Sequence, residues 1–597
     1  MAQSWLLFAA ALAFAVGFIL GSNSFGAEIS GAAVKGGTLA SGAAKGDTIR
    51  LIVPASSPAD KAKLVGKGCA IVRDLAIGGQ NSSVVAICPK TVAGSIPNAT
   101  EDRKLSFTVS KAFPKGSLPQ GAKPQSLEAN NFVGVSKFWD AGITGAGSIV
   151  AILDTGIDYN HPSLKDSIIA SASFVDYTTD PMDDVGHGTH VAGIIASKGN
   201  PKIARCYRFE CGELYCYYAE VPCSEDHDFS FGMPANESIG IAPDAKIMMA
   251  KVCHPWGCFE SDIISGFEWA AKGVNITKQV DCSAKCGANK KCCAAAAGCA
   301  LQNMSVLAGS SVACSYANKV PNPGSLKAGQ ALCPAKDGNR TQGSSVRCLL
   351  KDENGNILLD KNGCRYGQVY CPPDAASCTY EFSYASVVAQ KCTGMTEQTT
   401  TVKPDVISVS LGGSPTYLFN SCDSSYPLVK EMQSVVQRKN IPVVVAAGNN
   451  GYGVSIPACS RWAVAVGATG DYYFDEGGFG FDYNHIAYYS GRGYAMYDHG
   501  VLAPGSFILS TVPKSDCWLC NPSGFEYLSG TSMATPMVAG FMALLKQKDP
   551  KLAGASLSSK LFASVTPAYI KGGYLFPETG FRRYEYGKGQ ITAQTIG

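Results

Sequence analysis

The chain has 597 residues, of which 46% are hydrophobic, so it is long enough to bury a large core and to hold several domains. Its formal charge of +3 is near neutral for this length and gives no sign of a nucleic-acid partner or an anionic membrane surface. The 24 cysteines, an even number, follow a hydrophobic N-terminus and indicate disulfides formed in an oxidising compartment.

The first 27 residues have the pattern of a signal peptide. Trp5 to Leu20 is apolar, and Ser22 to Ala27 offers small residues for cleavage. No Lys or Arg precedes the apolar stretch, so a retained membrane anchor is the alternative. We therefore expect a secreted or cell-surface protein, in contact with a membrane only if this segment is kept. Export would allow glycosylation at the sequons of Asn81, Asn98, Asn236, Asn275, Asn303 and Asn339.

Residues 28–125 read as a separate small α+β domain that ends in a linker. A helical stretch over Pro58 to Leu64 is surrounded by strand-like runs, and Cys69 and Cys88 could pair across the domain. Phe113 to Pro124, rich in proline and glycine, predicts an exposed linker. The strand-like runs are Thr48 to Val53, Ala70 to Leu75, Ser83 to Ile87 and Leu105 to Val109.

Three later segments carry residues that suit covalent acyl transfer. The apolar run Ser148 to Leu153 predicts a buried strand, which places Asp154 at its carboxyl end, where open α/β sheets hold their chemistry. His187 lies between glycines, which let backbone and substrate approach the imidazole. Ser532 precedes an apolar helical run, so it faces unpaired N–H groups and a positive dipole end. An activated nucleophile needs an acid that orients an imidazole, an imidazole that takes a proton, and a hydroxyl that attacks.

These segments resemble the subtilisin-like serine proteases. The motifs Asp154-Thr155-Gly156, His187-Gly188-Thr189-His190 and Gly530-Thr531-Ser532-Met533-Ala534 stand in that family's chain order of Asp, His and Ser. The resemblance implies an α/β fold: a doubly wound, mostly parallel sheet over 126–597, preceded by a prodomain over 28–125 that inhibits the enzyme until it is cut away. The alternative for 28–125 is a permanent accessory domain. The segment Tyr586 to Ile591 resembles the usual close of the catalytic domain, so no further domain is expected after it.

The resemblance also assigns roles. Ser532 would attack the scissile carbonyl, His187 would take and return the proton, and Asp154 would orient His187. Asn449, after the apolar run Pro442 to Ala447, would donate to the oxyanion. The expected substrate-binding residues are Ser410, Leu411, Gly412, Gly413, Ala447 and Gly448. Because Asn450 stands where some relatives have an acid, we expect a large apolar residue before the cut.

Two cysteine-rich insertions interrupt the family pattern. The smaller covers 198–233 and the larger 275–403, which holds 12 of the 24 cysteines and predicts a disulfide-stapled subdomain. Since 275–403 precedes the Ser410 strand, we expect it near the substrate cleft. It would either restrict or recruit substrates, or act only as a stabilising surface decoration. Disulfides are favoured over zinc for Cys282, Cys286, Cys292 and Cys293, because no paired C-x-x-C signature is present.

No cofactor is required for this chemistry, although structural calcium at an unassigned site is compatible with the family. His161-Pro162 is followed by Ser163 where relatives have an Asp calcium ligand. His190 lacks further metal ligands nearby in sequence, and His161 is expected to be structural.

Two functions remain open. The first is an exported serine endopeptidase made as a proenzyme, with protein or peptide substrates and its own prodomain as inhibitor. The second is a catalytically idle surface protein that uses the fold and the insertion for binding. The intact set of Asp154, His187, Ser532 and Asn449 favours the first.

Overall fold

The computed structural model describes residues 48–593, apart from 79, 107–109, 112–125, 202, 212–215, 222–223, 225–228, 234, 287–288, 317–329, 334–343, 350–358, 361–365, 372–377, 424–425, 476–477 and 567–582. The expected signal segment 1–27 and the linker Phe113 to Pro124 therefore lie outside the described residues.

The main body is built on one ten-stranded, mostly parallel sheet with the strand order β30-β31-β27-β25-β23-β21-β7-β12-β8, and β26 pairs with β25 outside this path. Neighbours from β8 to β31 run parallel, whereas β30 and β26 run antiparallel to their partners. The strands are β7 (Ile149–Asp154), β8 (Ile168–Ser173), β12 (Lys246–Lys251), β21 (Val406–Val409), β23 (Val443–Ala446), β25 (Ala463–Asp475), β26 (Gly478–Ile486), β27 (Gly500–Pro504), β30 (Val565–Thr566) and β31 (Gln590–Ile591).

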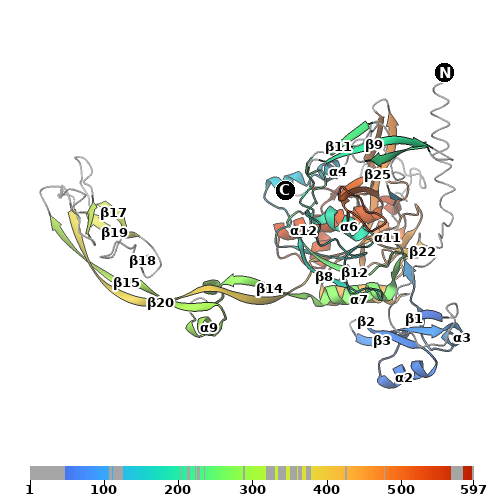
Figure 1. Cartoon of the computed structure of the whole chain (residues 1–597), viewed down its shortest axis with the longest axis horizontal. Helices are drawn as coiled ribbons and strands as arrows, with labels where there is room; N and C mark the ends of the chain where they lie inside the picture. The colour runs from blue at the N-terminus through green and yellow to red at the C-terminus, as the bar shows by residue number, and fades with distance from the viewer. Residues whose placement is uncertain are drawn as a thin grey trace.

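Helices cover both faces of this sheet (Figure 1). Val150 and Ile152 of β7 join the core that contains α6 (His187–Ala196) and α12 (Thr531–Lys548). Ala151 and Leu153 join the opposite core with α7 (Glu260–Lys272) and α10 (Pro427–Lys439). Because successive strand side chains point to opposite faces, an all-apolar strand fits only between two cores. The predicted doubly wound α/β fold is confirmed.

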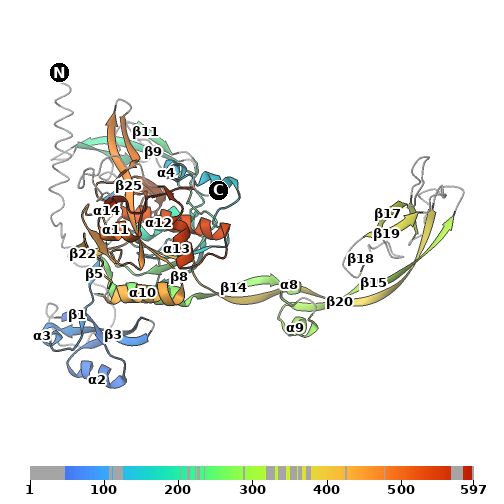
Figure 2. The same ribbon diagram turned by 180° about the vertical axis from the view of Figure 1, so that it is seen from behind.

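A separate four-stranded sheet forms the N-terminal module, residues 48–105. Its order is β2-β3-β1-β4, and a Cys69–Cys88 disulfide joins it as expected. One face of the sheet buries Leu64 of the helix α2, while β2 packs on α7 and α10 of the main body (Figures 1 and 2). The elements are β1 (Thr48–Pro54), α2 (Pro58–Gly66), β2 (Ala70–Ile77), β3 (Gln80–Pro89), α3 (Lys90–Ala93), β4 (Thr100–Glu101) and β5 (Lys104–Leu105).

Buried ion pairs fasten this module to the main body. The Arg50 guanidinium lies 3.1 Å from Asp262 of α7, and Arg73 also pairs with Asp262. Asp102, within the module, lies 2.6 Å from Arg50 and holds its guanidinium in place. The Asp262 side chain has no solvent exposure, so its charge depends on these partners. Removing one partner of such a buried pair typically costs about 3–5 kcal/mol, which makes the docking geometry specific.

The small insertion contains a three-stranded sheet of order β10-β9-β11. Its strands are β9 (Ile203–Cys211), β10 (Cys216–Val221) and β11 (Phe229–Met233).

The large insertion forms a long arm. Its strand β20 (Cys378–Val402) pairs antiparallel with β14 (Val274–Asp281) and β15 (Cys299–Tyr316). At about 3.3 Å per residue, its 25 residues span roughly 80 Å. Figures 1 and 2 show the arm extending away from the main body.

Three disulfides staple the described middle of this arm, around α8 (Cys282–Cys286) and α9 (Lys290–Ala295). They confirm the preference for disulfides over zinc at these cysteines. The pairs are Cys282–Cys299, Cys286–Cys292 and Cys293–Cys392.

The expected position of this insertion beside the substrate cleft is wrong. The arm leaves at Gly273, after α7, and returns through Lys403 to the amino end of β21. Ser410 follows the carboxyl end of that strand. Since the two ends of a parallel strand lie at opposite edges of the sheet, the arm is attached at the edge away from Ser410.

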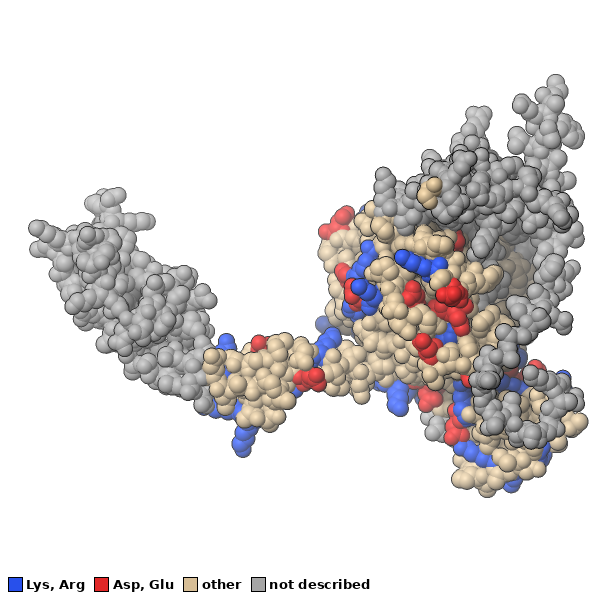
Figure 3. All heavy atoms as spheres, viewed as in Figure 1, with Lys and Arg blue, Asp and Glu red and all other residues tan. Residues whose placement is uncertain are grey.

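The surface agrees with the near-neutral composition. On the face drawn in Figure 3, basic and acidic side chains of the described residues are interspersed. No helix in the described part of the chain has both the length and the apolar character needed to cross a bilayer.

Candidate active site

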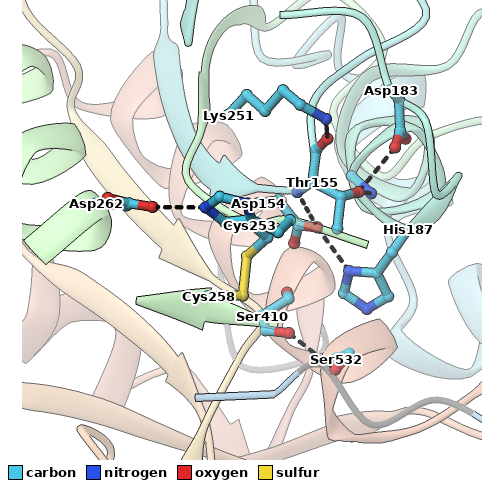
Figure 4. The surroundings of a disulfide bond; sticks show 12 residues. Asp154, Thr155, Asp183, His187, Lys251, Cys253, Cys258, Asp262, Ser410 and Ser532 are labelled. Carbon is cyan, nitrogen blue, oxygen red and sulfur yellow. Dashed lines mark hydrogen bonds and ion pairs between the residues drawn. A yellow bond between two sulfur atoms is a disulfide. The ribbon is translucent and has the colours of Figure 1, made fainter. Parts of the chain in front are cut away.

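The predicted site residues gather at the carboxyl edge of the central sheet. The adjacent strands β7, β21 and β23 end at or just before Asp154, Ser410 and Asn449. The helices α6 and α12 begin at this edge with His187 and with Thr531, which precedes Ser532. Figure 4 draws Asp154, His187, Ser410 and Ser532 around one space.

His187 and Asp154 form a buried, hydrogen-bonded pair. Nδ1 of His187 lies 2.6 Å from Oδ1 of Asp154, and both side chains are at most 1% exposed. The same carboxylate oxygen accepts the Thr155 N–H at 2.7 Å. Because the carboxylate can only accept from the ring, the proton belongs on Nδ1 and Nε2 is left as the basic nitrogen.

Gly188 makes this approach sterically feasible. A Cβ atom there would lie 2.2 Å from the Gly156 carbonyl oxygen and 3.2 Å from the Asp154 Cβ. Any side chain would therefore push α6 away from the end of β7. This accords with the sequence argument that glycines beside His187 allow close approach.

A second carboxylate, Asp183, braces the same turn. It accepts from the hydroxyl groups of Thr155 and Thr189 and from the N–H groups of Val185, Gly186 and Thr189. The Thr155 oxygen in turn accepts the Gly188 N–H at 2.8 Å. Sequence reasoning missed Asp183; its only signal was an acid shortly before His187.

Ser532 lies in the first turn of α12 and is 2% exposed. Its hydroxyl donates to the Ser410 carbonyl at 3.0 Å. The helices α6 and α12 pack together, and a Cβ at Gly540 would lie 3.7 Å from the Ile195 Cα. This contact lies eight positions beyond both Ser532 and His187 (540 − 532 and 195 − 187), and both helices begin at the carboxyl edge of the sheet. Figure 4 draws the His187 ring and Ser532 in the same part of the site.

Asn449 is held by Thr531, which sequence reasoning did not single out. Its side-chain oxygen accepts from both the N–H and the hydroxyl of Thr531 at 2.8 Å. A backbone N–H can only donate, so the atom facing it must be the amide oxygen and the NH₂ group points elsewhere. Asn449 lines the same cleft as Ser532.

The expected substrate-binding residues enclose a cleft of about 190 Å³. Leu411, Gly412, Gly413 and Gly448 line it together with Asn449, Asn450 and Ser532. Ser410 contributes the carbonyl that receives the Ser532 hydroxyl. Ala447 is buried and uses its N–H to bond Val466, so it supports the wall from behind.

Strand β13 (Cys258–Phe259), which pairs with β5, ends a short loop that is closed by a disulfide. Cys253 and Cys258 are both buried and close the short loop that follows β12 (Figure 4). At the end of β12, two residues before Cys253, the buried Lys251 ammonium donates to the Thr155 carbonyl and to Asp184, both at 2.6 Å.

The described residues that follow the N-terminal module pair with the main body at two places near Ser532. Strand β5 pairs antiparallel with β13, and Ser106 exchanges two backbone hydrogen bonds of 3.0 Å with Gly412. Further on, β6 (Ser110–Lys111) pairs with β29 (Phe525–Ser529), which leads into Ser532. A segment of the protein itself is thus bound as an added strand on both sides of Ser532.

His161 and His190 make hydrogen bonds that hold the fold together. His161 bonds the Gly524 carbonyl at 3.0 Å, and its Nδ1 accepts the Ser163 N–H. His190 donates through Nε2 to the Ile508 and Glu526 carbonyls. Burial lowers the pKa of His190 to about 3, so this ring stays neutral.

Metal-ligating geometry is sparse in the described residues. The one group of three His, Cys, Asp or Glu side chains found there within reach of a common ion is Cys282, Cys299 and Cys392, whose sulfurs are all in disulfides. Ser163, at the position where relatives carry a calcium ligand, donates its hydroxyl to the Gly199 carbonyl.

Comparison with known proteins agrees with this geometry. The model of the subtilase family matches residues 145–342 and 376–583, more than half of the chain. The chain is 23% identical to the minor extracellular protease Vpr of Bacillus subtilis over 486 residues, 76% of this chain and 52% of Vpr. It is 25% identical to the serine protease AprX of the same species over 423 residues, 69% of this chain and 59% of AprX. The chain thus spans between half and three fifths of these relatives' length.

Proposed function

Because the chain belongs to the subtilase family, we propose that it is a serine endopeptidase that hydrolyses peptide bonds through an acyl-enzyme on Ser532. His187 acts as the general base and then as the general acid, and Asp154 holds the tautomer that leaves Nε2 basic. Asn449 and the Ser532 N–H stabilise the oxyanion. The observation that carries this proposal is the buried 2.6 Å His187–Asp154 bond beside Ser532 at a helix N-terminus.

The chain is made as a proenzyme with the N-terminal module as its inhibitor. The module's outgoing chain pairs with Gly412 before Ser532 and with β29 after it, as a substrate would on each side of the bond to be cut. The first cleavage therefore falls between Ser106 and Ser110. The large interface around Asp262 then retains the cut module in place as a product-like inhibitor.

The enzyme acts outside the cytoplasm, on protein or peptide substrates. The disulfides of the main body and the arm support this location, since such bonds persist in oxidising compartments. The relative Vpr is named as an extracellular protease. Asn275, at the root of the arm, keeps an exposed side chain and is one of the proposed glycan acceptors. No cofactor takes part in the chemistry, and any calcium would be structural.

Labelling with a fluorophosphonate tests the proposal. The purified chain should become labelled at Ser532, and prior incubation with a serine-protease inhibitor should prevent it. The Ser532→Ala chain, as the control, should remain unlabelled. An unlabelled wild-type chain of normal fold would instead favour an idle scaffold that uses its arm for binding.

A further inference from the structure

Arg103, in the segment that enters the cleft, is held by two residues of the main body. Its carbonyl accepts the Glu260 N–H at 2.9 Å, and its Nε lies 3.5 Å from Oε1 of Glu260. Its guanidinium carbon lies 3.8 Å from the centre of the Tyr426 ring. A carboxylate and an aromatic face arranged around one planar cation are the two features that recognise arginine.

Glu260 is unusually buried for an acid at the start of a helix. Acidic residues are common in the first turn of helices, but their side chains normally reach water. The Glu260 side chain is only 1% exposed, and no described group donates a hydrogen bond to its Oε2 atom. Burial raises the pKa of this carboxyl to about 7, and Arg103 opposes that rise. A buried carboxylate with spare acceptor capacity is costly for stability, which indicates a role in binding.

The register fixes where this pair lies relative to the bond to be cut. Ser106 pairs with Gly412, and the preceding Leu105 is 3% exposed among the apolar residues of the main body. Arg103 stands three residues before Ser106. A cavity of about 400 Å³, lined by Arg103, Leu105, Glu260 and Ser414 among others, adjoins the two side chains. It leaves room for a longer or differently placed cation.

We propose that Glu260 and Tyr426 form a subsite that selects substrates with arginine three residues before the position that pairs with Gly412. In the proenzyme Arg103 occupies this subsite. After the N-terminal module is released, the arginine of a protein or peptide substrate takes its place, with an apolar residue two positions later where Leu105 now lies. The subsite thus directs the enzyme to basic segments with the pattern Arg-x-apolar upstream of the cut.

This inference rests on the proposed protease activity. The competing account is that the Arg103–Glu260 contact serves only to dock the N-terminal module. The two differ for the mature enzyme, because docking alone predicts no preference among peptide substrates.

The experiment measures kcat/KM of the mature enzyme for three quenched fluorescent peptides. The first copies residues 102–112 of the chain, and the others replace its arginine by alanine or by lysine. Rates are expressed per active site titrated with a fluorophosphonate, so a variant that matures poorly can still be measured. The arginine peptide should exceed the alanine peptide by about tenfold, with the lysine peptide between them because an ammonium lacks the planar fork.

Variants then test whether Glu260 and Tyr426 produce the preference for arginine. Glu260→Gln should reduce the arginine-to-alanine ratio to about twofold, the share that the aromatic face retains. Glu268→Gln is the matched control, since Glu268 is an exposed acid on the same helix and should keep the tenfold ratio. Tyr426→Leu should lower the ratio, whereas Tyr426→Phe, which keeps the ring, should preserve it. The Tyr426 pair decides the question if Glu260→Gln does not fold.

The experiment distinguishes failure of the subsite proposal from failure of the protease proposal. Equal kcat/KM for the arginine and alanine peptides would overturn the subsite and leave the protease proposal intact. A ratio that survives both Glu260→Gln and Tyr426→Leu would also overturn it. Absence of cleavage of every peptide, together with absence of labelling, would refute the protease proposal itself.

Discussion

The Nδ1 atom of His187 lies 2.6 Å from Oδ1 of Asp154, and the two residues are brought together by the end of β7 and the start of α6. Asp154→Asn should preserve the fold, because the side chains are nearly equal in size. It should lower kcat by about 10⁴-fold, as expected when the acceptor that fixes the histidine tautomer becomes a donor. The measurement is kcat on a small peptide with thermal melting as the control; a loss below tenfold would contradict the assignment.

The oxyanion prediction concerns Asn449 and its support, Thr531. Asn449→Ala should lower kcat by about 10² to 10³-fold with little change in KM; this magnitude comes from the equivalent change in a subtilase. Thr531→Val removes the hydroxyl donor to Asn449 and should cost about tenfold. Thr531→Ser keeps that donor and should remain near the wild-type rate. A Thr531→Val enzyme with unchanged kcat would show that Asn449 needs no such support.

Removal of the arm should leave catalysis intact. Asn275 and Thr401 are directly paired across the root of the arm, so a two-residue Asn-Gly turn can replace residues 276–400. Because the arm joins the amino edge of the sheet, cleavage of a short peptide should stay within about twofold of the full chain. Loss of peptide cleavage in a folded, fluorophosphonate-reactive variant would contradict this. A change confined to folded protein substrates would assign the arm to recruitment.

Acid should destabilise the fold through buried histidines. Burial lowers the pKa of His161, His190 and His499, with that of His190 near 3. The unfolded chain therefore binds more protons below pH 6.5, and stability falls as the pH drops from about 6.5 toward 3. Thermal melting of Ser532→Ala, which avoids autolysis, should show this slope, and His190→Gln should reduce it. An equal pH slope in the His190→Gln variant would contradict the prediction.

The preference for arginine over alanine should increase as the pH rises, whereas the binding of any chain over Glu260 should weaken. With a chain bound over it, the Glu260 carboxyl has a pKa of about 7. Binding of that chain therefore takes up a proton between about pH 4.5 and 7, and it becomes less favourable as the pH rises. The carboxyl attracts arginine only when ionised, so the arginine-to-alanine ratio should increase through about pH 7. The ratio measured from pH 5.5 to 8.5 should stay constant in Glu260→Gln.

Much of this architecture follows from local sequence patterns. Continuous apolar runs predicted β7 and β23, and the motifs around Asp154, His187 and Ser532 predicted which side chains would meet. These patterns are local, and the chain order of a doubly wound sheet brings their ends to one edge.

Other features could not be predicted because they depend on tertiary contacts. The roles of Thr531 and Glu260 arise from partners 82 and 157 positions away, Asn449 and Arg103 (531 − 449 and 260 − 103). The predicted position of the arm is wrong because the arm is near Ser410 in sequence but the length of β21 separates them in space. The pairing of the six cysteines in the described middle of the arm depends on the fold, since six cysteines allow 15 pairings.

The most direct test of the account compares the processing of the wild-type chain and Ser532→Ala, expressed side by side in an oxidising host. N-terminal sequencing and intact mass of both products are the readouts. The account predicts a new wild-type N-terminus created by cleavage between Ser106 and Ser110, and an uncut Ser532→Ala chain with its N-terminal module still attached. A Ser532→Ala chain cut at the same bond would contradict the claim that Ser532 is the nucleophile.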